Sequence, residues 1–234
     1  MVCLLFRCVV TFLNHMEKQP KSKTVKGKRA SPDHQFSGFR NLDIGSPQLA
    51  GSTRQVEGGW DLVAGGADIW GKSDQFHFLC KPISGDFDIA IRVESFIPAH
   101  LYSKAGLMVR ETLNADCPHL MFLVFSDNSP RNNNLGAYEM QFRSGAAGDC
   151  QAIYPAVKPP ASPEFPAAYP NSWLRVERLG NRFSAFASTD GKTWKVYAVQ
   201  TLTLASLVYV GPALTSHDPQ KTAKACFRNY TESR

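Results

Sequence analysis

Polar and aromatic side chains recur at every second position in three segments, the spacing that brings side chains to one face of a β-strand. The three faces hold Lys104, Gly106, Met108 and Arg110; Glu139, Gln141 and Arg143; and Trp173, Arg175 and Glu177. Guanidinium and amide groups donate hydrogen bonds to hydroxyls and carboxylates, and an indole ring adds an apolar surface. If the three strands neighbour one another, their common face is suited to polar or acidic sugars.

His119 begins the apolar run HLMFLVFSD and is a further polar candidate for this face. The candidate ligand-binding residues are therefore Lys104, Arg110, His119, Gln141, Arg143, Trp173 and Arg175. The structural alternative is that the charges form ladders across a solvent-facing sheet, that Trp173 covers an edge, and that His119 is a packed histidine. No catalytic residue is assigned.

Two aromatic motifs have both a structural and a functional interpretation. Trp60 and Trp70 flank the segment VAGGAD, and we expect core aromatics there, with an exposed stacking platform as the alternative. STDGKTW is one residue short of the aspartate box of sialidase propellers, Ser-x-Asp-x-Gly-x-Thr-Trp, and it does not repeat along the chain. We interpret it as a hairpin turn, with Gly191 at positive φ and Trp194 over the turn.

Several candidate metal ligands lie near turns. Four aspartates could offer oxygen ligands to calcium: Asp68, Asp74, Asp86 and Asp88. Aspartate is also common at turns because its side chain bonds neighbouring backbone amides. The four cysteines of the main domain, Cys80, Cys117, Cys150 and Cys226, form no Cys-x-x-Cys pair, so we expect buried thiols, with disulfides as the alternative, and no zinc site. We expect no cofactor, with calcium as the alternative.

The motifs of familiar enzymes are missing from the sequence. No glutamate is followed by aspartate two positions later, which excludes the Glu-x-Asp-x-x-Glu strand of retaining glucanases. A Gly-x-Ser-x-Gly elbow, a His-Glu-x-x-His helix and a phosphate-binding glycine loop are also missing. A binding protein is therefore favoured over an enzyme.

The elements that must position these residues are β-strands. From Gly38 onward the apolar pattern has a period of two, most clearly in GDFDIAIRVESF, and long helical periods are missing. Further strands are predicted at 138–143, 173–179, 183–188, 196–199, 208–214 and 224–229. Many short strands without helical crossovers favour an all-β fold, a two-sheet antiparallel β-sandwich of the jelly-roll type.

Charge and composition divide the 234-residue chain into two parts. Residues 1–37 combine an apolar N-terminus with a basic arm that we expect to be disordered, and this part holds most of the formal charge of +6. Residues 38–234 form the predicted sandwich, with a proline-rich insertion at 155–170. No specific nucleic-acid binding and no transmembrane span are expected. A cytoplasmic location is favoured for the chain as written, and secretion if the N-terminal run is a degenerate signal.

Four motifs in order resemble a known domain: GGADIWGKSDQFHFL, ISGDFDIAIRVES, SKAGLMVRETL and SWLRVERLGNRFSAFASTDGKTW. They resemble a bacterial domain related to the DUF1349 proteins, a group that includes a fungal protein named for regulation of enolase. The resemblance covers about residues 41 to 230 and implies a concanavalin A-like jelly roll of the lectin/glucanase superfamily. It suggests a carbohydrate-binding module and supplies no mechanism.

The expected function is therefore that of a non-catalytic module that binds carbohydrate. Two alternatives stay open: an intracellular regulatory protein that holds a protein partner, and a glycoside hydrolase or lyase with an unfamiliar site. Exposed aromatics in a groove would favour sugar, a broad apolar patch would favour protein, and two facing carboxylates would favour hydrolysis.

Overall fold

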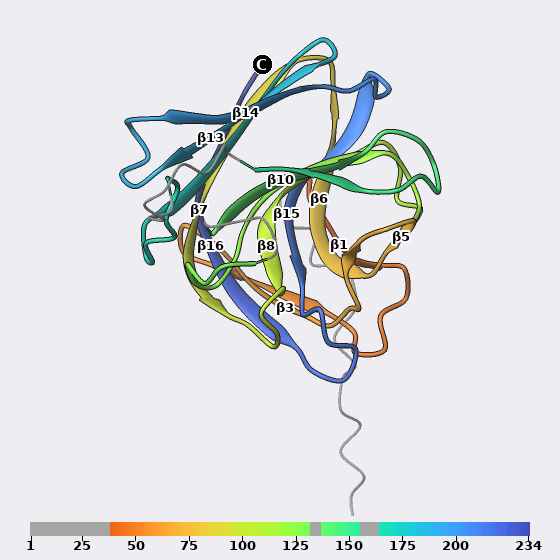
Figure 1. Ribbon diagram of the computed structural model, residues 1–234, viewed down its shortest axis with the longest axis vertical. Coiled ribbons are helices and arrows are strands. Elements are labelled where there is room, and N and C mark those ends of the chain that lie inside the picture. Colours follow the sequence, from red (N-terminus) through yellow and green to blue (C-terminus); the bar gives the residue numbers. More distant parts are fainter. Residues whose placement is uncertain (1–37, 132–136, 155–163) are drawn as a thin grey trace, which may run out of the picture. The chain divides into compact units, whose positions relative to one another are not determined.

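The computed structural model describes residues 38–131, 137–154 and 164–234. The predicted basic arm and residues 155–163 of the proline-rich insertion lie outside the described residues. Within these ranges the chain contains no helix and forms two seven-stranded antiparallel sheets and a short hairpin (Figure 1). The predicted all-β sandwich is thus confirmed.

The first sheet runs in the order β1 (Arg40–Ile44), β6 (Phe76–Ser84), β15 (Leu207–Thr215), β8 (Lys104–Arg110), β9 (His119–Val124), β10 (Tyr138–Arg143) and β11 (Gln151–Ile153). The second sheet runs in the order β14 (Lys195–Thr201), β13 (Arg182–Ser188), β12 (Ser172–Leu179), β7 (Phe87–Ile97), β16 (Ala223–Ser233), β3 (Gly59–Ala64) and β2 (Ser52–Val56). The hairpin pairs β4 (Ile69–Trp70) with β5 (Ser73–Asp74).

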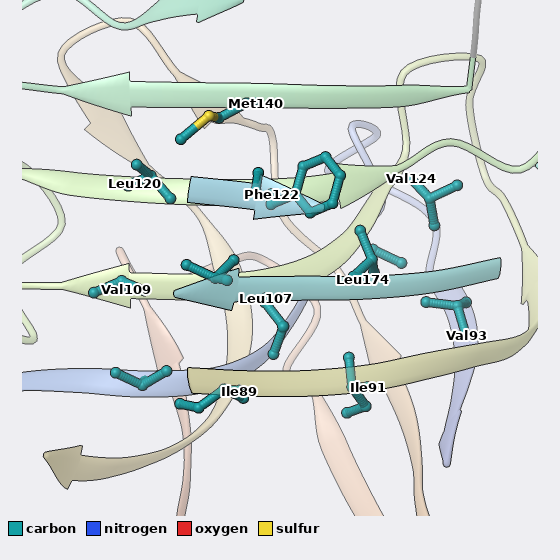
Figure 2. Packing of buried hydrophobic residues seen from close by; sticks show 14 of the residues in the cluster. Ile89, Ile91, Val93, Leu107, Val109, Leu120, Phe122, Val124, Met140 and Leu174 are labelled. Carbon is teal, nitrogen blue, oxygen red and sulfur yellow. The ribbon is translucent and has the colours of Figure 1, made fainter. Parts of the chain in front are cut away.

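The main core lies between the two sheets. Alternate residues of β7 and β12, such as Ile89, Ile91 and Leu174, face Leu107 of β8 and Phe122 of β9 (Figure 2). Each such side chain contributes about 1.5–3 kcal/mol when it leaves water. The period of two in the sequence therefore arises because alternate residues of each strand are buried in this core. It also determines which face of each strand is turned away from the core.

The outer face of the first sheet is also apolar near its centre. Phe76, Phe78, Met108, Met121 and Leu123 form a second buried cluster on this face. For this reason every residue of β8 and β9 is buried, as the two-sided apolar pattern of HLMFLVF predicts for a central strand. Because these apolar residues are buried, loops must cover this face of the sheet. The same loops carry several residues of the candidate site.

The sheet order divides the candidate ligand-binding residues into two groups. β8, β9 and β10 are neighbours, and the register places Arg110 opposite His119 and His119 opposite Arg143. β12 pairs with β7 and β13 in the second sheet, so Trp173 and Arg175 do not join that row. The strands that carry Lys104 and Gln141 therefore lie in one sheet, as the sequence-based hypothesis requires, but the strand that carries Trp173 lies in the other sheet.

Candidate functional site

A buried ionic network crosses the outer face of the first sheet. Arg143 donates from Nη2 to Oδ1 of Asp74 at 2.6 Å and from Nη1 to Oδ2 at 3.0 Å, and Arg110 donates to Oδ2 at 3.3 Å. The side chains of all three residues are 0% exposed. Burial raises the pKa of the Asp74 carboxyl, and the hydrogen bond and charge of Arg143 and the charge of Arg110 oppose that rise.

The remaining donors of the two arginines are used by the loops above the sheet. Arg110 donates to the carbonyls of Thr112 and Asn114, and Arg143 donates to the carbonyl of Gly71 at 2.9 Å. Gln141 is buried as well and donates to the carbonyl of Ile69 at 2.8 Å. The sequence predicts that these side chains face a groove, but in the structure they lie under the covering loops and hold them through hydrogen bonds.

His119 lies between Asp74 and Cys150. This arrangement resembles a catalytic triad, in which an acid orients a histidine base next to a cysteine nucleophile. Its Nδ1 lies 3.6 Å from Oδ2 of Asp74, and its Nε2 lies 3.7 Å from Sγ of Cys150. Burial holds the pKa of His119 well below its ordinary value, and burial raises the pKa of Cys150 to about 12. A nucleophilic cysteine needs a low pKa and access to substrate, so this arrangement is structural.

The same three residues are the one group among the described residues whose ligand atoms lie close enough to hold a metal. However, Asp74 already compensates two guanidinium groups, and a divalent cation there would sit beside both positive charges. The other aspartates considered for calcium are also engaged: Asp68 by Lys104 and His217, Asp86 by the Gly180 amide, and Asp88 by Arg175. The four are dispersed over both sheets and their loops, so they do not form one calcium cage.

A cavity of about 280 Å³ opens beside this network and is named here the first-sheet pocket. Its lining combines aromatic rings with charged groups: Asp68, Trp70, Tyr102, Lys104, Phe125, Arg131, Glu139, Tyr154 and His217. Of the candidate ligand-binding residues, only Lys104 lines it. Lys104 and Glu139 come from β8 and β10 by strand alternation, while the other residues arrive on the hairpin and loops.

Trp70 is the exposed aromatic surface of this pocket. Trp70 is the last residue of β4, and it is 39% exposed. The Lys104 ammonium lies 5.2 Å from the centre of a Trp70 ring and is held by Asp68 at 2.8 Å and by the Ile69 carbonyl at 2.9 Å. The ring thus lies beside a cation and a carboxylate that are paired with each other. The expectation of a core residue is wrong for Trp70, whereas Trp60 does pack against the main core.

Two carboxyl groups of the pocket differ in their electrostatic state. Burial raises the pKa of Glu139, and the charge of Lys104 and a hydrogen bond with Tyr154 only partly oppose this. Burial also raises the pKa of Asp68, but His217 and Lys104 outweigh it and leave that pKa below its ordinary value. The pocket therefore offers a charged acceptor at Asp68 and a carboxyl at Glu139 for which ionisation is costly.

We expect Glu139→Gln to stabilise the protein at neutral pH relative to the wild type. Because the folded-state pKa of Glu139 lies above the ordinary 4.5, the wild type loses stability as the pH rises from 4.5 through the folded-state value. Glutamine does not ionise, so the advantage should be present at pH 7 and vanish at pH 4. Urea unfolding at both pH values measures it. An equal difference at both pH values would contradict this electrostatic account.

The loop residues that line the pocket could not be identified from the sequence. Tyr102, Phe125, Tyr154 and His217 come from four separate connections, and no spacing links them. Arg131 is buried, donates to the carbonyls of Leu101 and Ser129, and lies over the Phe125 ring. Only the topology of the first sheet brings these residues to one place.

Comparison with known proteins identifies the fold. No family model matches the chain, and no curated protein matches it. Among solved structures, a functionally unknown protein from Saccharomyces cerevisiae is similar with a TM-score of 0.62 and 20% identity, over 84% of this chain and 96% of that chain. Carbohydrate-binding module CBM66 from Bacillus subtilis gives 0.53 and 14%, also over 84% and 96%.

A legume lectin-like domain from Entamoeba histolytica is similar with a TM-score of 0.52 and 7% identity, over 85% of this chain and 90% of that chain. At such low identities the likeness concerns the fold. No helix among the described residues has the length and apolar character needed to cross a membrane. The chain therefore has a two-sheet jelly-roll β-sandwich fold, which it shares with these solved structures.

Proposed function

We propose that the protein is a non-catalytic, lectin-like module that binds carbohydrate in the first-sheet pocket. The observation that carries this proposal is the half-exposed Trp70 ring beside the fixed pair of Lys104 and Asp68. A sugar ring has an apolar face of C–H groups that packs on an indole, and hydroxyls that need both donors and acceptors at its edge. The pocket supplies all three.

The size and composition of the pocket agree with a small polar ligand. A cavity of about 280 Å³ is near the lower end of ordinary ligand sites, which suits one sugar unit. Most of its charged groups have an opposite charge beside them, because Lys104 pairs with Asp68 and Arg131 pairs with Asp127 at the edge of the pocket. A neutral or weakly acidic sugar therefore fits better than a polyanion such as nucleic acid, which requires a strongly basic surface.

The two carboxyl groups of the pocket favour a second candidate, a glycoside hydrolase. Glu139 has a raised pKa and Asp68 a lowered one, the opposite tendencies that an acid and its partner carboxylate need. Release of reducing ends from a bound oligosaccharide would support this candidate if it disappeared in Glu139→Gln. We expect binding without release, because Asp68 is already paired with the Lys104 ammonium and lies beside His217.

A glycan array probed with the full chain tests the proposed function. The expected result is selective binding to a group of related glycans, with competition by the same sugar in solution. Silence across diverse neutral and acidic glycans would overturn it and favour a protein partner. The resemblance to DUF1349-related domains agrees with a sugar ligand, and the likeness to CBM66 supports it through the fold.

A further inference from the structure

A second cavity, of about 480 Å³, lies over the outer face of the second sheet and is named here the second-sheet groove. It is formed by β7, β12 and β16 together with the turn between β13 and β14, and it is lined by Asp88, Ala90, Trp173, Arg175, Gly191, Trp194, Asn229, Thr231, Glu232 and Ser233. Neighbouring residues such as Ile89 and Leu174 point into the main core. The groove therefore faces away from that core and from the first-sheet pocket.

A small residue makes the floor of the groove. Ala90 of β7 lies opposite Arg175 of β12 on one side and opposite Thr231 of β16 on the other. Because alanine extends only one carbon from the backbone, the longer side chains around it form walls. Thr231 and Asn229 are exposed along one wall and offer hydroxyl and amide groups.

Two tryptophan rings form the opposite wall. The rings of Trp173 and Trp194 are nearly perpendicular, with centroids 6.4 Å apart, and both are partly exposed. Gly191, at φ +69°, lies against Trp173, and a Cβ there would come within 2.7 Å of the indole. Only glycine fits this turn and this contact, so the hairpin holds both rings in place.

The turn itself is held by its own hydrogen bonds. The Asp190 carboxylate accepts hydrogen bonds from the amides of Lys192 at 2.8 Å and Thr193 at 2.7 Å, and the Ser188 hydroxyl donates to it at 2.9 Å. The aromatic wall is therefore arranged before any ligand arrives, which lowers the entropy lost on binding. The STDGKTW turn therefore positions the two tryptophan rings in addition to joining β13 and β14.

The polar groups of the groove are fixed and nearly neutral in sum. Arg175 donates to both oxygens of Asp88, at 2.7 and 2.6 Å, and its guanidinium stacks over the Phe186 ring at 4.6 Å. Glu232 lies opposite Ile89, and its carboxylate is held by Lys81 of β6 at 2.7 Å, so it is turned away from the groove. A charged ligand would find no uncompensated partner in the Arg175–Asp88 pair, and a phosphate would meet the Asp88 carboxylate.

We propose that the second-sheet groove is a separate binding site for an uncharged sugar residue. The apolar face of the ring would pack on the tryptophans, and its hydroxyls would meet the Arg175–Asp88 pair and Thr231. This inference goes beyond the first-sheet pocket and makes the protein bivalent. Two sites that face away from each other favour the bridging of separate polysaccharide chains, and sites engaged together gain avidity.

Affinity electrophoresis of the full chain in gels that contain soluble arabinoxylan, galactomannan or barley β-glucan tests the second site, with polygalacturonate as the acidic comparison. Trp194→Ala removes one wall, and Ala90→Leu fills the floor without removing an aromatic ring. Each should weaken retention by at least one neutral polysaccharide about tenfold. Val196→Ala, at an exposed apolar position outside the groove, is the matched control. Thermal unfolding shows that each variant is folded.

The outcomes separate the two sites. Retention of both groove variants equal to that of Val196→Ala in every neutral gel would overturn the second site. If Trp70→Ala alone removes all retention, the second site fails and the first-sheet pocket stands. If Trp194→Ala and Ala90→Leu weaken retention while Trp70→Ala does not, the second site stands and the proposed function of the first-sheet pocket fails. No retention of the wild type in any gel would overturn the second site.

Discussion

Asp74→Asn is expected to lower the free energy of unfolding by about 3–5 kcal/mol, the cost of removing one partner from a buried ionic network. The substitution leaves Arg110 and Arg143 without a compensating charge at positions that water does not reach. It also loosens the loops that these arginines hold through the carbonyls of Thr112 and Gly71. Since domains of this size unfold at about 5–15 kcal/mol, the effect should be evident in a urea titration.

Asp61→Asn is the matched control for this prediction. Asp61 also lies between two arginines, at 2.6 Å from Arg54 and 2.7 Å from Arg228, but Arg54 is largely exposed to solvent. Asp61 and Arg228 also keep some contact with water, at 22% and 15% exposure, whereas the Asp74 network has none. Asp61→Asn should therefore cost clearly less than Asp74→Asn. Equal costs for Asp74→Asn and Asp61→Asn would show that the buried network does not hold the loops as described.

Trp70→Ala is expected to weaken binding of the glycan selected on the array by at least tenfold, or about 1.4 kcal/mol. Aromatic side chains in the centre of a binding site commonly account for losses of this size. Lys104 should keep its place, because Asp68 and the Ile69 carbonyl hold its ammonium without the indole. Isothermal titration calorimetry measures the change, and Trp70→Phe should lose less because it keeps an aromatic face.

The control for Trp70→Ala is Ile97→Ala. Ile97 is a large apolar residue with 62% exposure, on β7 and outside the first-sheet pocket. Both variants shorten a partly exposed apolar side chain to alanine, and only the first should lose binding; thermal unfolding of each variant shows that it stays folded. An unchanged affinity in Trp70→Ala would remove the observation on which the proposed function rests.

The sandwich could be predicted from the sequence because its core imposes a period of two. The strands expected around Ile89, Leu120, Met140 and Leu174 all exist, and the parity of the segments around Ile89, Met140 and Leu174 correctly assigns their inner faces. The two-sided apolar run of β9 also correctly indicates a strand covered on both faces. These features depend on local pattern, which a single sequence contains.

The site could not be predicted in the same way, because strand order and loop cover are long-range properties. Alternation places Arg110 and Arg143 on the outer face, but it does not show that Asp74 and its hairpin close over them. Alternation likewise does not show that β8 belongs to the first sheet and β12 to the second. Trp70 differs from Trp60 in its tertiary surroundings, so the sequence predicts a core residue at both positions although Trp70 is exposed in the pocket.

The most direct test of the central claim is a titration of the full chain, labelled with ¹⁵N, with the glycan selected on the array. The protein has four tryptophans, and their indole N–H signals report on separate places: Trp60 on the main core, Trp70 on the first-sheet pocket, and Trp173 and Trp194 on the second-sheet groove. Substitution of each tryptophan assigns its signal. We predict that the Trp70 signal shifts in a saturable way while the Trp60 signal does not move. A Trp70 signal that stays in place at saturating glycan would contradict carbohydrate binding in the first-sheet pocket.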